Sequence, residues 1–487
     1  MIEDWKRCAV RRDGFYDLET EDLGGVPVRL FVTKALFDEA EPTLYRQIVN
    51  AARFLGARLV AITPDVHYGY GVPVGCVILT DRHEGAVAMG PVGFDIGCGM
   101  MSARSNVPAE AATPDRKLAF NREVIKRVAL GPGGQGERLS ERAFGEVIRG
   151  GAEAWTDRHG VGVDRGRAER QRIPVDDAWD VPFGGPGKPE RGLDQLGTLG
   201  GGNHFIELQR GEEAGTLFVQ VHTGSRGFGH GLATNYFAMA RDERPEVREL
   251  DLGYFTPESP HYHAYQNAVA AGANFAIVNR LVLFEKIAEA FRKVFREDLE
   301  LVYEISHNLV QAEHHPDYGD VWVHRKGATR AFPAGHPALV GTRWEHEGHP
   351  VLVPGSNRDY SYILRPLPGA VRSGFSVNHG AGRRMSRGEA VRILDQRKVD
   401  EQYRHAGVQV NDDGRVPLDE SAACYKPAEE VVRAVVDAGL ARIEHTLWPL
   451  ASIKGSEERA AQAVRSERKV RDKSRDRARE DARRRKG

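Results

Sequence analysis

The chain has 487 residues, of which 41% are hydrophobic, and it carries 68 basic against 69 acidic side chains. A chain of this length and composition can bury one large core or two or three ordinary ones. No stretch approaches the roughly 18 consecutive apolar residues of a membrane span. The N-terminus, "MIEDWKRCAV", is too polar for a signal peptide. These features favour a globular protein and exclude a membrane-embedded one.

The charge is unevenly distributed along the chain. Residues 456–487 hold 13 basic against 7 acidic side chains, a net charge of +6, whereas the rest holds 55 against 62, a net charge of −7. This tail has two valines and no larger apolar residue, so we expect it to be disordered or a single exposed helix. The four cysteines form no Cys-x-x-Cys pair, which favours a reducing cytoplasm over a disulfide framework.

The pattern along the chain predicts a mixed α/β fold. Short apolar runs that end in polar turns predict strands over 72–80, 215–225, 301–308 and 320–327. Residues 131–192 are rich in Gly, Arg and Asp, and we interpret them as an elaborated insertion with long loops. Apolar residues at helical spacing predict two helices within 264–295. A further helix is predicted over 428–440, where Gly439 is a plausible stop signal.

Polar residues recur where the predicted strands run into glycine-rich turns. The segments are "GFDIGCGM" (93–100), "LGGGNHFIEL" (199–208), "VHTGSRGFGH" (221–230) and "EISHNL" (304–309). They supply carboxylate, thiolate and imidazole groups, which are common ligands of divalent transition metals. The candidate ligands are Asp95, Cys98, His204, His222 and His307.

Each of these residues taken singly is more simply explained as a structural residue, so the metal hypothesis depends on the whole set. A thiolate can bridge two metal ions, and two ions with open positions suit phosphoryl transfer. Ligand softness suggests zinc and does not exclude manganese.

Three further motifs leave their roles open. In "PDVHYGYGVPVG" (64–75), His67 either supports the metal site or is a structural histidine. In "HRKGATRA" (324–331), the cluster of Arg325, Lys326 and Arg330 either contacts phosphate or forms a solvated face. In "SVNHGAGRRMSR" (376–387), His379 is a base, a ligand or a nucleophile next to an arginine cluster. No Walker A motif is present, so any nucleotide is bound outside the P-loop mode.

These motifs, in this order, resemble the RtcB family of RNA-splicing ligases from about residue 23 to 455. The resemblance includes the closing "IKG" (453–455) and implies a single large catalytic domain over residues 1–455, with glycine-rich loops and a mostly antiparallel sheet region around a dinuclear metal centre. It also implies GTP and two Mn²⁺ ions as cofactors. The substrate would be RNA with a 3′-phosphate or 2′,3′-cyclic phosphate end and a 5′-hydroxyl end, and the partner an archease-type activator.

The resemblance also assigns site residues. Cys98 would bridge the two ions, with His222 and His307 on one and Asp95 and His204 on the other, and His379 would be the nucleophile that takes up guanylate. The implied nucleotide contacts are Asn203, His204, Phe205, Glu207, Asn308, Pro354, Ser356, Ser361, Gly380, Ala381, Gly382, Tyr425 and Lys454. The implied contacts to RNA phosphates are Arg226, Arg383 and Arg387; Arg384 is left without a role.

Two features depart from the family pattern. Residues 357–361 read "NRDYS" where the family has a run of mostly small residues, and Asn378 precedes His379 where Cys or Ser is common. Two alternative functions remain: a dinuclear metal-dependent RNA phosphoesterase, which leaves His379 without a role, and a catalytically inactive RNA-end-binding protein. We also expect the basic tail to assist RNA binding, or to be a solvated appendage.

Overall fold

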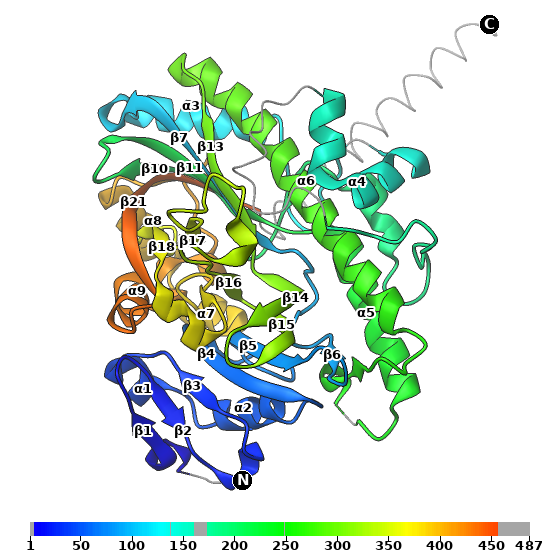
Figure 1. Cartoon of the computed structure of the whole chain (residues 1–487). Helices are drawn as coiled ribbons and strands as arrows, with labels where there is room; N and C mark the ends of the chain where they lie inside the picture. The colour runs from blue at the N-terminus through cyan, green and yellow to red at the C-terminus, as the bar shows by residue number, and fades with distance from the viewer. Residues whose placement is uncertain (1–3, 137, 160–172, 248, 456–487) are drawn as a thin grey trace, which may run out of the picture.

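The computed structural model describes residues 4–136, 138–159, 173–247 and 249–455 (Figure 1). The basic tail, for which an exposed helix or disorder was expected, lies outside these residues, as does part of the insertion predicted over 131–192. The described part of that insertion differs from the expected long loops. It contains helix α4 (Glu141–His159), which is kinked at Gly151, before loops resume at 173–188.

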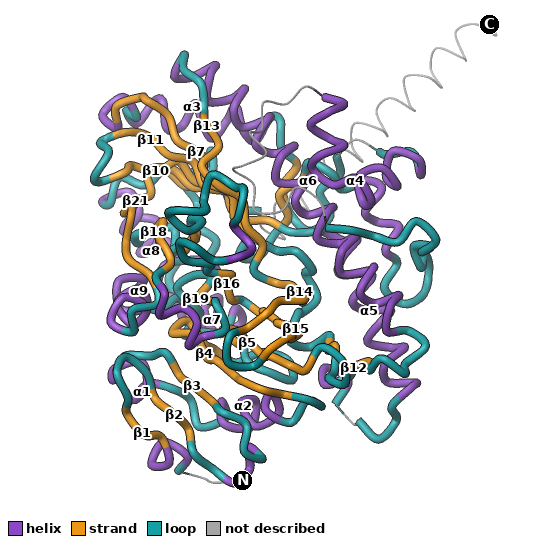
Figure 2. The backbone as a smooth tube through the Cα atoms, viewed as in Figure 1, coloured by secondary structure: helices purple, strands orange, loops and turns teal. Residues whose placement is uncertain are grey.

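A seven-stranded sheet lies in the lower part of the view, nearer the N-terminus (Figure 2). In spatial order its strands are β1 (Ala9–Arg11), β2 (Tyr16–Leu18), β3 (Val28–Leu30), β4 (Ala57–His67), β5 (Val74–Asp81), β15 (Gly319–Lys326) and β14 (Asn308–His315). All neighbours are antiparallel except β3 and β4. Two of the predicted strands, over 72–80 and 320–327, are confirmed as β5 and β15.

An eight-stranded sheet forms the second layer. Its main path is β13 (Glu300–Ser306), β7 (Gly99–Pro108), β11 (Thr216–Thr223), β10 (Phe205–Gly211), β21 (Ala441–Lys454), β18 (Ser361–Pro366) and β17 (Val351–Val353), and β20 (Gln409–Val410) pairs with β21. Every pair is antiparallel except β20 with β21. The predicted strands over 215–225 and 301–308 correspond to β11 and β13, and the expected mostly antiparallel sheet region is confirmed.

Three two-stranded ribbons and a set of helices complete the fold. The ribbons pair β6 (Val87–Ala88) with β12 (Tyr254–Phe255), β8 (Ala129–Leu130) with β9 (Thr198–Gly200), and β16 (Ala328–Arg330) with β19 (Ser376–Asn378). The remaining helices are α1 (Lys34–Glu39), α2 (Leu44–Ala52), α3 (Pro114–Ile125), α5 (Arg226–Glu243), α6 (Tyr262–Phe295), α7 (Arg387–Ile393), α8 (Gln396–His405) and α9 (Ala428–Asp437). The predicted helix over 428–440 is confirmed as α9, and Gly439 follows it with φ of 60°.

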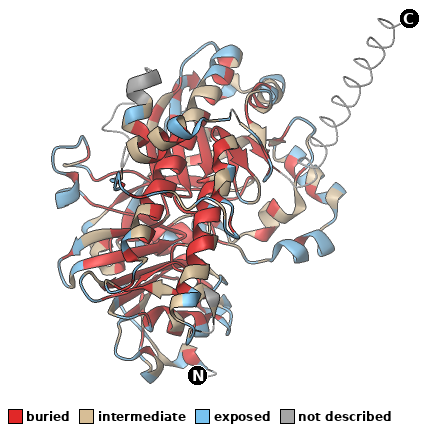
Figure 3. Ribbon diagram, turned by 90° about the vertical axis from the view of Figure 1, so that its right-hand side faces the viewer, coloured by how far each residue is buried: buried red, intermediate tan, exposed pale blue. Residues whose placement is uncertain are grey.

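Alternation along the strands fixes how the layers stack. On β4, Leu59 and Ala61 face a core shared by the two sheets, whereas Val60 and Ile62 face the core beneath α1 and α2. In the second sheet, residues such as Met101 pack instead against α3 and α6. Successive residues of a strand point to opposite faces, so both sheets are buried on two sides. Figure 3 shows buried residues concentrated along the strands and the central helix.

Helix α6 corrects one expectation. The sequence suggested two helices within 264–295, but α6 is one continuous helix of 34 residues. By length and composition alone it could also cross a membrane, although 83% of its most apolar window is buried inside the protein, as in the core helix of a globular protein. Its small residues let the 96–97 turn approach closely. A Cβ on Gly272 would lie 2.9 Å from Ile96.

The strand register brings the polar turns together at one edge of the second sheet. Gly99, which follows the "GFDIGC" turn, pairs with both Ser306 and Thr223. Phe205 pairs with both His222 and Lys454. Because these strands are antiparallel, the starts of β7 and β10 meet the ends of β11, β13 and β21 there. This edge holds the candidate site.

Candidate active site

The five predicted metal ligands lie together at this edge, centred on Cys98. Its Sγ is 3.2 Å from His222 Nε2 and 3.4 Å from His204 Nε2. His222 Nε2 is in turn 3.2 Å from His307 Nε2, and His204 Nε2 is 3.1 Å from Asp95 Oδ2. The sulfur therefore lies between two ligand pairs. This arrangement, together with the close grouping of Cys98, His204 and His222, could hold a metal ion.

The hydrogen bonds of the histidines fit a metal-binding role. His204 Nδ1 lies 3.0 Å from the Leu199 carbonyl oxygen, and His222 Nδ1 lies 3.1 Å from that of Asn203. A carbonyl oxygen only accepts, so each Nδ1 carries a proton, and Nε2 is the nitrogen that faces the sulfur and can bind a metal ion when it is unprotonated.

Electrostatics favours the ligand forms of the imidazoles and of Asp95, whereas burial and the charge of Asp95 raise the pKa of the Cys98 thiol. Burial, with the nearby charge of other histidines, holds the pKa values of His222 and His307 well below the ordinary value, so both imidazoles are neutral. Burial opposes ionisation of Asp95, but its hydrogen bond and charge interaction with His204 outweigh burial and lower its pKa to about 2. The donor set therefore fits a divalent cation.

Arg280 of α6 joins three of the four segments that carry the ligands. Its guanidinium donates to the carbonyl oxygens of Gly97 at 2.8 Å and Thr223 at 3.0 Å, and to Ser306 Oγ at 2.8 Å. Each acceptor is adjacent in sequence to a candidate ligand. The completely buried guanidinium also forms an ion pair with Glu304. Sequence reasoning missed Arg280, because its position inside an apolar helical pattern indicated only a core helix.

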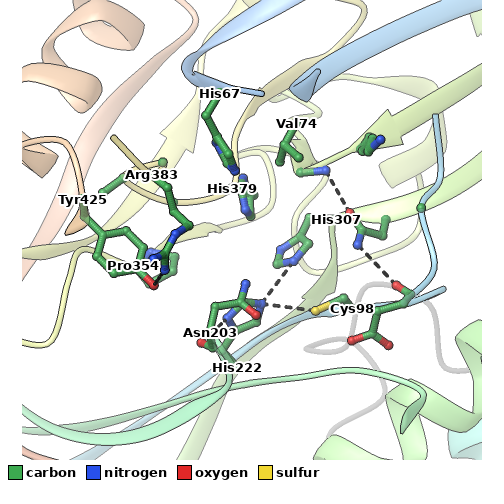
Figure 4. Close-up of a pocket in the computed structure, with 18 of the residues that line it drawn as sticks. His67, Val74, Cys98, Asn203, His222, His307, Pro354, His379, Arg383 and Tyr425 are labelled. Atoms are coloured by element: carbon green, nitrogen blue, oxygen red, sulfur yellow. Dashed lines mark hydrogen bonds between the residues drawn. The ribbon is translucent and has the colours of Figure 1, made fainter. Parts of the chain in front are cut away.

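His379 lines the same cavity and lies directly beside His307 of the predicted ligand cluster (Figure 4). Its ring centroid is 4.8 Å from that of His307. The β16–β19 pairing places Asn378 opposite Ala328, so His379 lies next to the Gly327 turn. A Cβ on Gly327 would come 2.9 Å from the His379 ring. A glycine is required there because the turn has φ of 59° and the imidazole occupies the space of a side chain.

Asp65 orients His379 and was also missed by sequence reasoning. Its Oδ2 lies 2.6 Å from His379 Nδ1, and the backbone N–H groups of His379 and Gly380 donate to the same oxygen at 3.1 and 3.3 Å. Burial disfavours the Asp65 carboxylate, yet the interaction with His379 lowers its pKa. The imidazole therefore donates from Nδ1 and leaves Nε2 as its reactive nitrogen. The sequence signal for this residue is the aspartate of "PDVH", the motif in which only His67 was interpreted as a site residue.

His67 has a supporting position. It lines the cavity, and its Nδ1 lies 3.0 Å from the carbonyl oxygen of Asp65. Burial lowers its pKa to about 4, so the ring is neutral. It therefore helps to hold the segment that carries Asp65.

The site opens into a cavity of about 450 Å³ that also holds most of the predicted nucleotide contacts. Its walls include Asn203, Phe205, Glu207, Asn308, Pro354, Ser356, Gly380, Ala381, Gly382, Tyr425 and Lys454. His204 and Ser361 do not line it. Ser361 lies behind the wall and accepts hydrogen bonds from Gly355 N and Gln209 Nε2, each at 3.1 Å. The turn at Gly382 is glycine for a reason other than ligand contact: a Cβ there would collide with the Asp65 carbonyl oxygen.

A buried carboxylate, Glu420, gathers the cationic residues at the far end of the cavity. Glu420 Oε1 lies 2.7 Å from Arg387 and 3.2 Å from Arg383, and Oε2 accepts from Tyr425 at 2.5 Å and Lys454 at 3.3 Å. Burial alone would raise the pKa of Glu420, but these cations and the Tyr425 hydroxyl lower it. No sequence signal identified Glu420, which lies in an ordinary "LDES" turn.

The predicted phosphate contacts divide into two groups. Arg383 and Arg387 line the cavity, whereas Arg226, at the start of α5, does not. Arg226 donates to Thr198 Oγ1 at 3.2 Å and has φ of 56°, a left-handed conformation that is unusual outside glycine.

The basic segment 324–331 is largely structural, which corrects the possibility of a phosphate site there. Arg325 is buried and binds both oxygens of Glu313, at 2.6 and 2.9 Å. Arg330 is buried and donates to Gln311 Oε1 at 3.1 Å. Of its basic residues only Lys326 lines the cavity, and its Nζ donates to the Tyr70 and Val72 carbonyl oxygens.

The "NRDYS" segment (357–361), which replaces mostly small residues of the family pattern, places only one of its four large residues on the cavity wall. Of residues 357–360, only Asn357 lines the cavity. Arg358 lies over the Tyr403 ring, Asp359 accepts from the backbone N–H of Ala428 at 2.9 Å, and Tyr360 packs against Trp448. The larger side chains therefore point toward α8, α9 and β21.

The fold and site define a class: a mixed α/β protein with a Cys–His–carboxylate cluster, beside which a carboxylate-oriented histidine faces a nucleotide-sized cavity. The family model described as "tRNA-splicing ligase RtcB" matches residues 47–455. A "tRNA-splicing ligase RtcB" of Pyrobaculum aerophilum is 35% identical, with 88% of this chain and 95% of the relative covered. A "tRNA-splicing ligase RtcB" of Thermococcus kodakarensis is 33% identical, with 88% of this chain and 95% of the relative covered.

A bacterial relative matches over its whole length. The "RNA-splicing ligase RtcB" of Mycobacterium bovis is 35% identical, with 84% of this chain and 100% of the relative covered. The chain belongs to the RtcB family. The resemblance inferred from the motifs is confirmed.

Proposed function

We propose that the protein is a GTP- and Mn²⁺-dependent RNA ligase that joins a 3′-phosphate or 2′,3′-cyclic phosphate end to a 5′-hydroxyl end through guanylylated His379. The observation that carries the proposal is the His379–Asp65 pair beside the Cys98 cluster at one cavity. A metal centre alone would serve a phosphoesterase, but it would leave this oriented histidine and the Glu420 cluster without a function.

The metal ions would be held by the five ligands grouped around Cys98. His222 and His307 would hold one ion, Asp95 and His204 the other, and the thiolate would be shared. Bound there, they would neutralise phosphate charge during transfer. Softness of the ligands alone favours zinc, so Mn²⁺ rests on family membership.

The protein residues supply orientation and a nucleophile. His379 Nε2 would attack the α-phosphorus of GTP and expel pyrophosphate, while Nδ1–H stays hydrogen-bonded to Asp65. A positive charge developing on the imidazole is stabilised by this buried carboxylate. Water would first open a 2′,3′-cyclic phosphate to a 3′-phosphate by breaking its bond to the 2′ oxygen. The guanylyl group would then pass to the RNA 3′-phosphate, and the 5′-hydroxyl would attack that activated end and expel GMP.

The far end of the cavity suits the guanylate and the RNA phosphates. Tyr425 offers an aromatic face, and Glu207 and Lys454 offer an acceptor and a donor for base edges. Arg383 and Arg387 supply fixed positive charge. Glu420 pre-orients these cations, so they need little reorganisation when an anion arrives.

Incubation with labelled GTP and Mn²⁺ tests the proposal. We expect acid-labile, base-stable label on the wild-type protein and none on His379→Ala, whereas His405→Ala, which removes an exposed histidine of α8, should be labelled normally. Label that survives in His379→Ala would refute the nucleophile. RNA cleavage without label would establish the phosphoesterase instead, and neither activity would indicate a protein that only binds RNA ends.

We also propose a cytoplasmic location and activation by an archease-type partner. The location is supported by four free cysteines among the described residues. The activator follows from family membership alone. Addition of such a partner should accelerate repeated turnover and leave the first guanylylation unchanged.

A further inference from the structure

The loop between β4 and β5 holds two tyrosine rings in solvent at the edge of the active site. Tyr68 is 62% exposed and Tyr70 is 69% exposed, although both belong to the segment that carries Asp65 and His67. Exposing two large aromatic rings on one short loop has no benefit for folding, because burial would stabilise them.

The loop backbone is held firmly even though the rings are exposed. Gln47 exchanges side-chain hydrogen bonds with both backbone groups of Gly69. Asn50 Nδ2 donates to the Gly71 carbonyl oxygen at 2.9 Å, and Lys326 Nζ donates to that of Tyr70 at 2.7 Å. The rings are therefore presented by a fixed support, which lowers the entropy cost of binding a partner.

The two rings face two adjoining cavities. Tyr70 lines the catalytic cavity. Tyr68 lines a second cavity of about 90 Å³. His67 and Arg383 line both cavities, so the second adjoins the first. A polymer whose end occupies the catalytic cavity can extend into the second one.

The walls of the second cavity indicate what kind of polymer fits. Arg384, which had no role from the sequence, is exposed and lines this cavity together with Lys426. Glu39 and Glu41 also line it. Guanidinium groups bind phosphates, aromatic faces stack on bases, and carboxylates accept hydrogen bonds from base amino groups. This combination matches single-stranded nucleic acid, with phosphates toward Arg384 and base edges toward the glutamates.

We propose that Tyr68, Tyr70 and Arg384 form a binding site for the last few unpaired nucleotides that precede the RNA 3′ end, in which the tyrosines stack on bases and Arg384 binds a phosphate. The site rests on the proposed function for the identity of the nucleic acid. It predicts that the protein prefers a single-stranded 3′ end to a base-paired one.

Anisotropy of a labelled single-stranded RNA with a 3′-phosphate measures this binding without GTP or turnover. Each lost stack should weaken affinity about tenfold, so Tyr68→Ala and Tyr70→Ala should each show this loss and the double variant more. The double Phe variant should stay near wild type, because the ring is kept. Arg384→Ala should weaken binding and flatten its salt dependence. Phe183→Ala removes an exposed aromatic residue that lines neither cavity, and it should bind normally.

A second readout locates the contact on the RNA. 2-Aminopurine placed within the last few nucleotides should be quenched on binding to wild type and not to the double alanine variant. Equal affinity and equal quenching in the two proteins, at equal melting temperature, would overturn the proposal, as would tighter binding of an acidic peptide than of RNA at this site. Because the guanylylation test is separate, its failure would remove the proposed ligase and leave this binding result standing.

Discussion

Replacement of Asp65 tests the link between structure and mechanism most directly. Three donors converge on Asp65 Oδ2, from His379 Nδ1 and from the backbone N–H groups of His379 and Gly380, while Thr63 donates to Oδ1 at 2.6 Å. In Asp65→Asn the amide oxygen must take the Oδ2 position, because the three donors exclude an NH₂ group. The geometry of His379 is then kept and only the charge is lost.

The magnitudes follow from the hydrogen bonds affected. A charge-assisted hydrogen bond exceeds a neutral one by about 1.4 kcal/mol, so Asp65→Asn should slow guanylylation about tenfold. Asp65→Ala removes the acceptor altogether, leaves the histidine unoriented and should lower the rate at least about a hundredfold. The assay is the initial rate of labelling by GTP at saturating nucleotide, with melting temperature as the check on folding.

An exposed aspartate of α1 provides the control for this prediction. Asp38→Asn removes an exposed carboxylate of α1 whose ion pair with Lys34 is also exposed, and it should leave the rate unchanged. If Asp65→Ala is labelled as fast as wild type, Asp65 does not orient His379 and the reasoning is wrong.

Three further predictions concern stability, metal binding and the tail. Burial raises the pKa of Glu207 to about 7 from its ordinary 4.5 despite nearby Lys454, so its contribution to folding stability is complete below pH 4.5 and lost as the pH rises through 7. In urea unfolding, the free energy of unfolding of Glu207→Gln should therefore exceed that of wild type by up to about 3 kcal/mol at pH 8.5 and by little at pH 5. An equal difference at both pH values would count against a buried, protonated Glu207. Arg280→Lys should weaken Mn²⁺ binding at least about tenfold in titration calorimetry, because an ammonium group cannot reach all three segments that the Arg280 guanidinium joins. Arg292→Lys, on the exposed side of the same helix, is the control and should leave Mn²⁺ binding unchanged. Deletion of 456–487, net charge +6, should weaken RNA binding and flatten its salt dependence; unchanged binding at low salt would show the tail to be a solvated appendage.

Much of the site could be predicted because its chemistry is local in sequence. Cys98, His222 and His307 each lie at a strand end beside glycine or small polar residues, so residue type and context together signalled ligands. The structure then brought all five predicted ligands into one cluster. The strands that carry His222 and His307 were also predicted, because alternating or buried apolar runs are properties of short segments.

The residues that were missed act over long sequence distances. Asp65 meets His379 across 314 positions, and Glu420 meets Lys454 across 34. Arg280 lies inside an apolar helical pattern that indicated only a core helix. Such partners are decided by which strands pair and which turns face each other, and no local pattern encodes this.

The sequence by itself determined the mixed α/β class, the ligand chemistry and the family, because these depend on residue types, their spacing and the order of motifs. Only the tertiary structure decided which charged residues face the cavity. Arg325 is paired with Glu313 in the interior, Arg383 and Arg387 are held at the cavity by Glu420, and the altered 358–360 side chains point away from it. The sequence gives the type of a charged residue but not whether its side chain is buried with a partner or free to bind a ligand. That difference depends on the folded structure.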